Sequence, residues 1–128
     1  MSQLKNTIIS NEINPITKES EANRILMKYS DRVPLIIKKH ENCELPQISK
    51  KKFLVPNSML CAELKYIITK YLNQELKDTN VSEKSIYLYI MNTNYSPKSS
   101  DLLSEVYHGH KADDNFLYLN YSSENTLG

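Results

Sequence analysis

The chain has 128 residues and a formal net charge of +1, and 40% of its residues are hydrophobic. This length supports one domain around a single core. The net charge is too small to indicate a nucleic-acid binder, and no apolar run reaches the roughly 20 residues that cross a bilayer. The two cysteines, Cys43 and Cys61, provide no disulfide framework, so we expect reduced, packed thiols in a cytoplasmic protein.

The N-terminal part of the sequence predicts helix followed by strand. Residues 1–17 are polar, with a short helix expected at 4–12. In "TKESEANRILMKY", residues 17–29, apolar side chains recur at helical spacing, and Thr17 is the expected cap. "RVPLIIKK", residues 32–39, is apolar without alternation, which predicts a strand covered on both faces, one of them by the preceding helix.

The middle of the sequence predicts an edge strand and a second helix. "KKKFLVP", residues 50–56, combines a short apolar run with lysines and a proline, which are typical of exposed sheet edges. "NSMLCAELKYIITKYL", residues 57–72, carries one apolar stripe at helical spacing and has Asn57 or Ser58 available as its cap. The polar segment 73–85 is expected to be a loop.

Two further strands are predicted near the C-terminus, at "SIYLYIM" (85–91) and "NFLYLNY" (115–121). "SSDLLSEVYHGH", residues 99–110, predicts a short helix between them that ends at Gly109. The element order indicates an α+β fold of β-grasp type, with a four-stranded mixed sheet that carries a helix across one face.

The sequence does not contain the residue patterns of known catalytic sites. The sequence has neither a glycine-rich phosphate loop nor a nucleophile elbow. His40 with Cys43, and His108 with His110, give only two ligands each, whereas a structural zinc site takes four. The adjacent Asp113–Asp114 should diverge on a turn rather than act as a carboxylate pair. We therefore predict no catalytic residue and no metal, and expect a protein that is not an enzyme.

Three stretches carry a resemblance to a known family. "KYSDRVPLIIKK", "KKKFLVP" and "FLYLNYSSENTLG" resemble, in this order, the autophagy ubiquitin-like modifiers, the family that includes GABARAP. The resemblance covers residues 17–128. It implies a ubiquitin-like β-grasp core with two additional N-terminal helices. The implied organisation is a helical extension at 1–30 packed on the core, a ubiquitin-like domain at 31–121 and a flexible conjugation tail at 122–128.

The resemblance implies that Gly128 is the site of lipid conjugation. In the family, an activating enzyme adenylates this glycine and a conjugating enzyme transfers it to phosphatidylethanolamine. A terminal residue without a Cβ allows the carboxylate to approach nucleotide and thiol closely. No priming cleavage is expected for a chain that ends at Gly128, although a cysteine protease would remove the lipid again. We expect a cytoplasmic protein without a cofactor that becomes anchored in autophagosome or vesicle membranes.

The resemblance also implies a groove for a short motif, the LIR motif of cargo receptors and adaptors. This motif has an aromatic residue, two variable residues and an aliphatic residue, usually with acids upstream. The bound peptide would add a strand beside "KKKFLVP". Carried over by position, the aromatic pocket consists of Ile25, Pro34, Ile36, Lys52, Leu54 and Phe116. The aliphatic pocket consists of Phe53, Val55, Pro56, Met59, Leu64 and Ile67. Arg32, Lys50 and Lys52 would meet the acids.

The sequence departs from the family pattern at several positions. Tyr71 stands where an arginine is common, Leu64 replaces a common phenylalanine, and Ser30 replaces a proline, so the ligand preference should differ. The connector 73–85 is longer than usual. With the "LG" ending, it resembles family members of parasites whose modifier decorates a relict plastid, the apicoplast. The alternative hypothesis is a ubiquitin-like peptide-binding scaffold that is never conjugated and has no need of Gly128.

Overall fold

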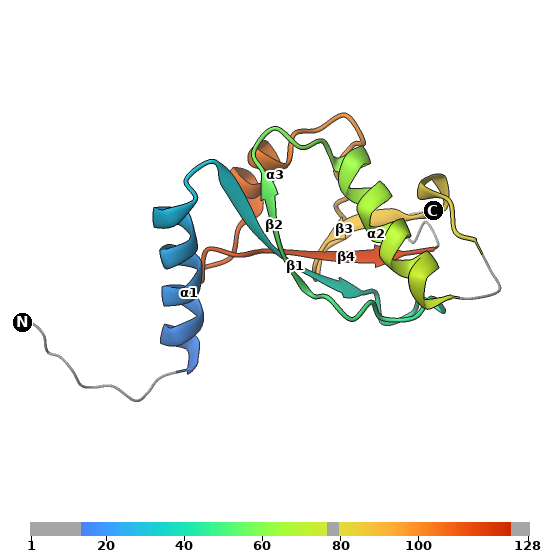
Figure 1. The fold of residues 1–128 in the computed structure, drawn as a ribbon, viewed down its shortest axis with the longest axis horizontal. Helices are drawn as coiled ribbons and strands as arrows, with labels where there is room; N and C mark the ends of the chain where they lie inside the picture. Colours follow the sequence, from blue (N-terminus) through green and yellow to red (C-terminus); the bar gives the residue numbers. More distant parts are fainter. Residues whose placement is uncertain (1–13, 77–79, 124–128) are drawn as a thin grey trace, which may run out of the picture.

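The computed structural model describes residues 14–76 and 80–123, and it has one mixed sheet with helices on both faces (Figure 1). The elements are α1 (Asn14–Lys28), β1 (Arg32–Lys39), β2 (Lys52–Pro56), α2 (Cys61–Glu75), the short 3₁₀ helix η1 (Glu83–Ser85), β3 (Tyr87–Ile90), α3 (Leu103–His110) and β4 (Leu117–Ser122). The strand order is β2-β1-β4-β3, with β1 and β4 parallel and the other pairs antiparallel. The prediction of an α+β fold with a four-stranded mixed sheet is confirmed.

The main core lies between α2 and the sheet. Alternate residues of each strand point to this face, because successive side chains of a strand face opposite sides. The helix contributes its buried stripe, and α3 closes one end of the same core. The residues are Val33, Leu35, Ile37, Phe53, Val55, Leu64, Ile68, Leu72, Leu103, Val106, Leu117 and Leu119.

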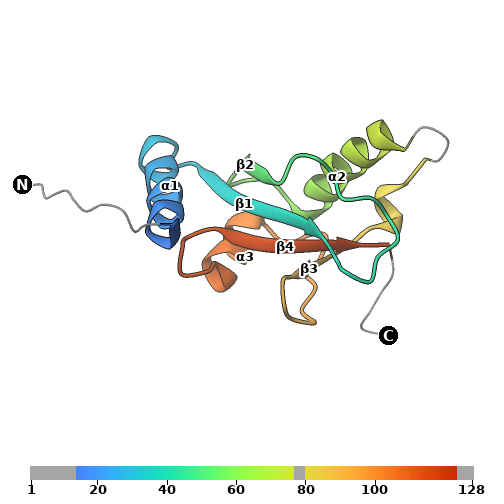
Figure 2. The same ribbon diagram turned by 90° about the horizontal axis from the view of Figure 1, so that it is seen from below.

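The second face of the sheet is covered by α1 at the end where β1 begins (Figures 1 and 2). Ala22 of α1 is fully buried against Ile36 and Phe116. The amide of Asn115 also donates to Asn23 Oδ1 at 2.7 Å. Residues 33–37 are all buried as a result. This confirms that β1 is covered on both faces, with α1 on one of them.

The helix α1 begins at Asn14, three residues before the predicted start. Pro15 therefore lies in the first turn, where proline is favoured because its fixed φ suits a helix and no partner is needed for an N–H group. The prediction that Thr17 caps this helix is wrong.

The start of α2 is capped by a distant loop rather than by Asn57 or Ser58, so that prediction is wrong as well. The N-cap residue is Leu60, and the N–H groups of the next two residues donate to the carbonyls of Asp101 and Ser99, at 2.9 and 3.0 Å. The Glu63 carboxylate accepts a hydrogen bond from Leu60 N–H at 2.8 Å. These partners satisfy first-turn donors that would otherwise lack one.

The remaining differences concern the ends of elements. The helix α2 continues to Glu75, inside the predicted loop, and β4 includes Ser122, inside the predicted tail. Gly109 lies within α3, which ends at His110, and does not adopt a positive φ. The expected helix at 4–12 and Gly128, the predicted site of conjugation, lie outside the described residues. Within residues 14–76 and 80–123, no helix is long and apolar enough to span a membrane.

Candidate peptide-docking site

The outer edge of β2 presents backbone groups whose direction follows from the strand register. The N–H of Ile37 donates to Lys51 O at 2.8 Å, and Pro34, which has no N–H, lies opposite Leu54. Hydrogen-bonded pairs alternate along an antiparallel ladder. The backbone groups of Phe53 and Val55 therefore face β1, and those of Lys52 and Leu54 face outward.

The outward N–H and C=O groups of Lys52 and Leu54 have no hydrogen-bond partner among the described residues. Such a row of unpaired groups is a template for another strand. An extended peptide placed beside β2 would therefore pair with these two residues.

The opposite edge of the sheet is closed by its own loop. The N–H of Ile90 in β3 donates to Tyr95 O at 2.9 Å, and the Ser96 hydroxyl donates to Leu88 O at 2.6 Å. These contacts occupy edge groups of β3, so this strand cannot accept a second chain in the same way. Among the four described strands, β2 is the edge that is open.

Five of the predicted aromatic-pocket residues gather on the α1 side of this edge. Leu54 lies in register with Pro34, and Ile36 packs with Phe116 beneath α1. Ile25 comes from α1 itself and is half-buried. Ile36 and Phe116 are almost completely buried, whereas Leu54 is partly exposed. The predicted aromatic pocket thus has the buried side chains of Ile36 and Phe116 next to the partly exposed Leu54.

Lys52, the sixth predicted residue of this pocket, is held by α1. Its ammonium Nζ lies 2.8 Å from Glu21 Oε2 and 2.9 Å from Oε1. Glu21 is not among the site residues predicted from the sequence. Its position four residues before Ile25 on the same helix face is the signal that could have identified it. An acidic ligand residue must compete with Glu21 for this lysine.

Five of the predicted aliphatic-pocket residues lie on the α2 side of the edge, and the sixth, Pro56, ends β2 in register with Arg32. Pro56, Met59 and Ile67 are partly exposed, whereas Phe53 and Val55 are buried. Leu64 has no exposed surface, so it lies behind the pocket surface as part of the main core.

An edge-to-face aromatic pair borders the predicted aliphatic pocket. Tyr71 meets Phe53 edge-to-face, with ring centroids 5.6 Å apart and an interplanar angle of 88°. Lys50 Nζ lies 5.2 Å from the centroid of the same Phe53 ring. Tyr71 thus fills the position of the family's common arginine with a neutral ring, and the cation near this part of the groove is Lys50.

The two predicted pockets lie on opposite faces of the sheet edge, and this geometry explains the motif spacing. Side chains of an extended peptide alternate between the faces, so residues i and i+3 point to opposite sides. The aromatic-pocket residues flank Lys52 and Leu54, and the aliphatic-pocket residues flank Val55 and Pro56. A peptide with its aromatic residue first must therefore run parallel to β2.

Of the cationic side chains expected to meet acidic ligand residues, Lys50 and Lys52 lie at the start of β2, whereas Arg32 lies at its far end, in register with Pro56. Lys50 and Lys52 are exposed and Arg32 is partly exposed. Arg32 lies at the start of β1 and Lys52 at the start of β2, and these strands are antiparallel. Exposed pairs of this kind contribute only about 0.2–1 kcal/mol each. They favour acidic partners without supplying most of the affinity.

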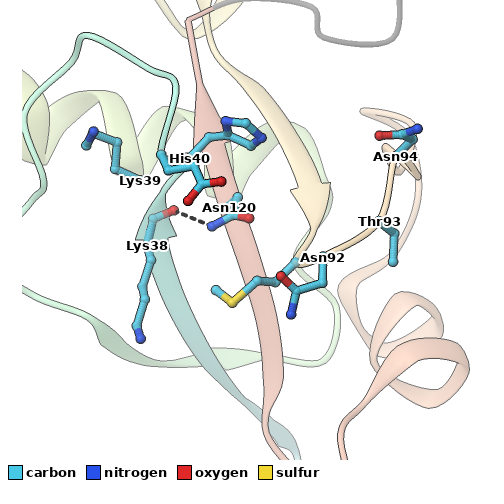
Figure 3. Close-up of a pocket in the computed structure, with 9 residues that line it drawn as sticks. Lys38, Lys39, His40, Asn92, Thr93, Asn94 and Asn120 are labelled. Carbon is cyan, nitrogen blue, oxygen red and sulfur yellow. Dashed lines mark hydrogen bonds between the residues drawn. The ribbon is translucent and has the colours of Figure 1, made fainter.

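A polar hollow of about 470 Å³ lies elsewhere, between the end of β1 and the turn after β3 (Figure 3). Its lysines do not converge: Figure 3 shows Lys38 and Lys39 pointing in different directions, and Lys39 Nζ donates to Cys43 O at 2.9 Å. The amide of Asn120 donates to Lys38 O at 3.2 Å. The hollow therefore lacks the cluster of converging groups that a charged ligand requires.

The described part of the chain offers neither a metal-binding cluster nor an activated Cys61 thiol. No three His, Cys, Asp or Glu side chains within residues 14–76 and 80–123 lie close enough to hold a metal ion. Burial, with a smaller contribution from Asp101, raises the pKa of the Cys61 thiol to about 11, so this cysteine stays protonated at neutral pH.

Comparison with known proteins gives consistent matches over most of the chain. Residues 17–128 match the family model described as autophagy protein Atg8 ubiquitin like. Autophagy-related protein 8B of Oryza sativa subsp. indica is 40% identical over 111 residues, which cover 87% of each chain. Autophagy-related protein 8e of Arabidopsis thaliana is also 40% identical, over 87% of this chain and 84% of the relative.

Two solved structures have the same fold. Plasmodium falciparum Atg8, solved in complex with a Plasmodium falciparum Atg3 peptide, superposes with a TM-score of 0.73 at 36% identity, covering 88% of this chain and 92% of that one. Trypanosoma brucei ATG8 superposes with a TM-score of 0.71, covering 86% of this chain and 88% of that one, and at 24% identity it supports the fold alone.

Proposed function

This chain belongs to the Atg8 family of ubiquitin-like autophagy proteins, and we propose that it is a lipid-conjugated adaptor that binds aromatic-x-x-aliphatic motifs. The open outer edge of β2 is the observation that carries the proposal. Its unpaired backbone groups at Lys52 and Leu54 supply affinity for any extended chain. The predicted side-chain pockets on the two faces supply sequence preference.

The aromatic residue of the motif would insert on the α1 side, beside Leu54 and above Ile36 and Phe116. The aliphatic residue would contact Met59 and Ile67 on the α2 side. Acidic residues upstream would approach Lys52, which first has to leave Glu21. Because the lysine already has a carboxylate partner, the bound ligand replaces one ion pair with another. The net contribution of this ion pair to the binding free energy is therefore small.

Conjugation through Gly128 is the second part of the proposal. The terminal carboxylate would form an acyl adenylate with ATP, releasing pyrophosphate, and then a thioester on an enzyme cysteine, releasing AMP. The amine of phosphatidylethanolamine would displace the thiolate and leave an amide. Each buried methylene of the acyl chains contributes about 0.8 kcal/mol, and two chains give stable anchoring. The partners are the activating and conjugating enzymes and a delipidating cysteine protease.

The conjugating-enzyme partner is supported by the structural neighbour from Plasmodium falciparum, an Atg8 solved with an Atg3 peptide. We propose autophagosome or vesicle membranes as the site of the conjugate. A relict-plastid membrane is the alternative, suggested by the long connector predicted at residues 73–85. The base of this connector is fixed by two hydrogen bonds between the Asn73 side chain and the Val81 backbone, at 2.7 and 3.0 Å.

Reconstitution tests the conjugation directly. The full chain would be incubated with the activating and conjugating enzymes, ATP and phosphatidylethanolamine liposomes, and its intact mass measured. We expect a mass increase of one phospholipid minus one water, and we expect deletion of Gly128 to abolish it while the circular dichroism spectrum stays the same. An unmodified mass with enzymes that conjugate another Atg8 protein would favour the unconjugated scaffold.

A further inference from the structure

The open edge of β2 is a template for a second copy of this chain as well as for a peptide. A two-fold axis places the β2 strands of two copies antiparallel, so that each strand supplies the donors and acceptors that the other needs. The strand has consecutive apolar residues at 53–55 and no glycine, which favours strand pairing. The lysines at its start, Lys50, Lys51 and Lys52, are the feature that opposes such pairing.

Three registers pair outward-facing residues of one β2 strand with those of the other. Hydrogen-bonded pairs form between residues whose backbone groups point outward, and these are Lys52 and Leu54. The two-fold axis therefore passes through Lys52, Phe53 or Leu54. The axis at Phe53 pairs both outward residues of each copy, because Lys52 then lies opposite Leu54 of the other copy.

With the axis at Phe53, lysines of each copy meet unfavourable neighbours on both faces of the sheet. The two Lys52 residues become diagonal neighbours, about 7–8 Å apart on the α1 side, which is within reach of long side chains. Lys51 lies opposite Val55 of the second copy, on the α2 side, where the predicted aliphatic pocket of that copy supplies an apolar surface. Moving an ammonium group from water onto such a surface without a carboxylate costs free energy.

The other two registers are unfavourable as well. With the axis at Lys52, the two Lys52 residues lie directly opposite each other, and like charges in this position destabilise a strand pair. With the axis at Leu54, Lys52 lies opposite Pro56 of the second copy, which is in register with Arg32 in β1 of that copy. Each register thus brings a lysine against another cation or against an apolar surface.

Glu21 offsets only part of this charge. Its carboxylate forms an ion pair with Lys52 at 2.8 Å. Among the described residues, neither Lys50 nor Lys51 has a carboxylate within ion-pair distance, and both are exposed. Two copies paired through β2 would therefore each bring three lysines and one neutralising carboxylate to the contact. An acidic peptide brings the missing negative charge instead.

We propose that Lys50, Lys51 and Lys52 prevent two copies of this chain from pairing through β2 and so reserve the edge for strands that carry acidic residues. The proposal gives a role to Lys51, which is not among the site residues predicted from the sequence. Specificity of this kind depends on rejecting a wrong partner as much as on attracting the right one. The exclusion does not rest on peptide binding. Its importance on a membrane rests on the proposed conjugation, because tethered copies have a high effective concentration.

The test compares the self-association of three full-length proteins by sedimentation equilibrium, without peptide. The first is the unmodified chain. The β2 variant is Lys50→Gln/Lys51→Gln/Lys52→Gln. The control variant is Lys84→Gln/Lys98→Gln/Lys111→Gln, which changes three exposed lysines outside β2. Each variant loses three positive charges, so the formal net charge falls from +1 to −2 in both, and they differ only in where the charge is removed.

We expect the β2 variant to self-associate at least about tenfold more tightly than the unmodified chain, because the unfavourable contacts occur twice in each two-fold pair. The control variant should behave like the unmodified chain. Adding Leu54→Pro to the β2 variant should abolish the gain, since proline removes an outward N–H from the paired edge. Urea unfolding checks that each variant is folded.

A β2 variant that associates no more than the control variant would overturn the exclusion, and so would a gain that survives Leu54→Pro in a folded protein. Binding of a motif peptide to the unmodified chain is measured separately by calorimetry. If that peptide does not bind, the proposed function is overturned, whereas the exclusion is decided by sedimentation alone.

Discussion

Replacing Leu54 by proline tests whether the β2 edge binds its ligand through the backbone. The N–H of Leu54 faces away from β1, so proline removes a donor that the folded chain does not use. Proline is tolerated on edge strands for this reason, and the preceding Phe53 already has the extended conformation that a residue before proline prefers. The side chain changes as well, and Leu54→Ala, which keeps the N–H, is therefore the matched control.

The expected loss of peptide affinity follows from the contacts and hydrogen bonds that each substitution removes. Leu54→Ala should weaken motif binding by about 1–3 kcal/mol through the loss of an anchor contact. Leu54→Pro removes in addition the donor for one peptide carbonyl, which is then buried without a partner. An unsatisfied group of this kind costs about 1–3 kcal/mol. Because 1.4 kcal/mol corresponds to a factor of ten, we expect the proline variant to bind about 5–150-fold more weakly than the alanine variant.

The assay is titration calorimetry with one acidic aromatic-x-x-aliphatic peptide and three proteins: the unmodified chain, Leu54→Ala and Leu54→Pro. Urea unfolding of both variants checks that the proline has not disrupted the sheet. Equal affinities of the two variants, with similar unfolding midpoints, would refute the inference that the Leu54 N–H binds the peptide.

Three further outcomes are expected. Glu21→Gln frees Lys52 and should tighten binding of an acidic peptide by up to about fivefold at low salt, the value of an exposed ion pair. This gain should shrink at high salt, and calorimetry showing no gain at either salt would contradict the competition. Tyr121→Phe leaves the buried Ile48 N–H, which donates to Tyr121 Oη at 3.0 Å, without its acceptor, and should lower the free energy of unfolding by about 1–3 kcal/mol; an unchanged urea midpoint would argue against it. Burial raises the pKa of Tyr121 from 10.0 to about 12 and that of Cys61 from 9.0 to about 11. The folded chain thus keeps protons that the unfolded chain has released, and stability should fall between about pH 9 and pH 12. A flat profile over that range would contradict this expectation.

Much of the fold could be predicted because the decisive signals are local. The contiguous apolar run of β1 indicates a strand covered on both faces, and the lysines and proline of β2 indicate an exposed edge. The cap of α2 could not be predicted from its own sequence. It depends on the carbonyls of Ser99 and Asp101, about 40 positions further along the chain, and only tertiary packing brings them to the helix start.

The candidate site was predicted in part, through the resemblance to a family. The resemblance predicts the pocket residues, but which face of the sheet each of them occupies follows from the register, in which Pro34 lies opposite Leu54. The ion pair between Glu21 and Lys52 joins α1 to β2 and exists only after α1 has docked. The complete burial of Leu64 likewise depends on packing against the sheet rather than on the helical stripe alone.

The most direct test of the docking account is amide hydrogen exchange of the chain, measured by NMR with and without the motif peptide. The account predicts that bound peptide slows exchange of the Lys52 and Leu54 amides strongly. The amides of Phe53 and Val55, already bonded to β1, should change little. Protection that appears at Leu88 and Asn92, at the opposite edge of the sheet, with Lys52 and Leu54 unaffected, would contradict it.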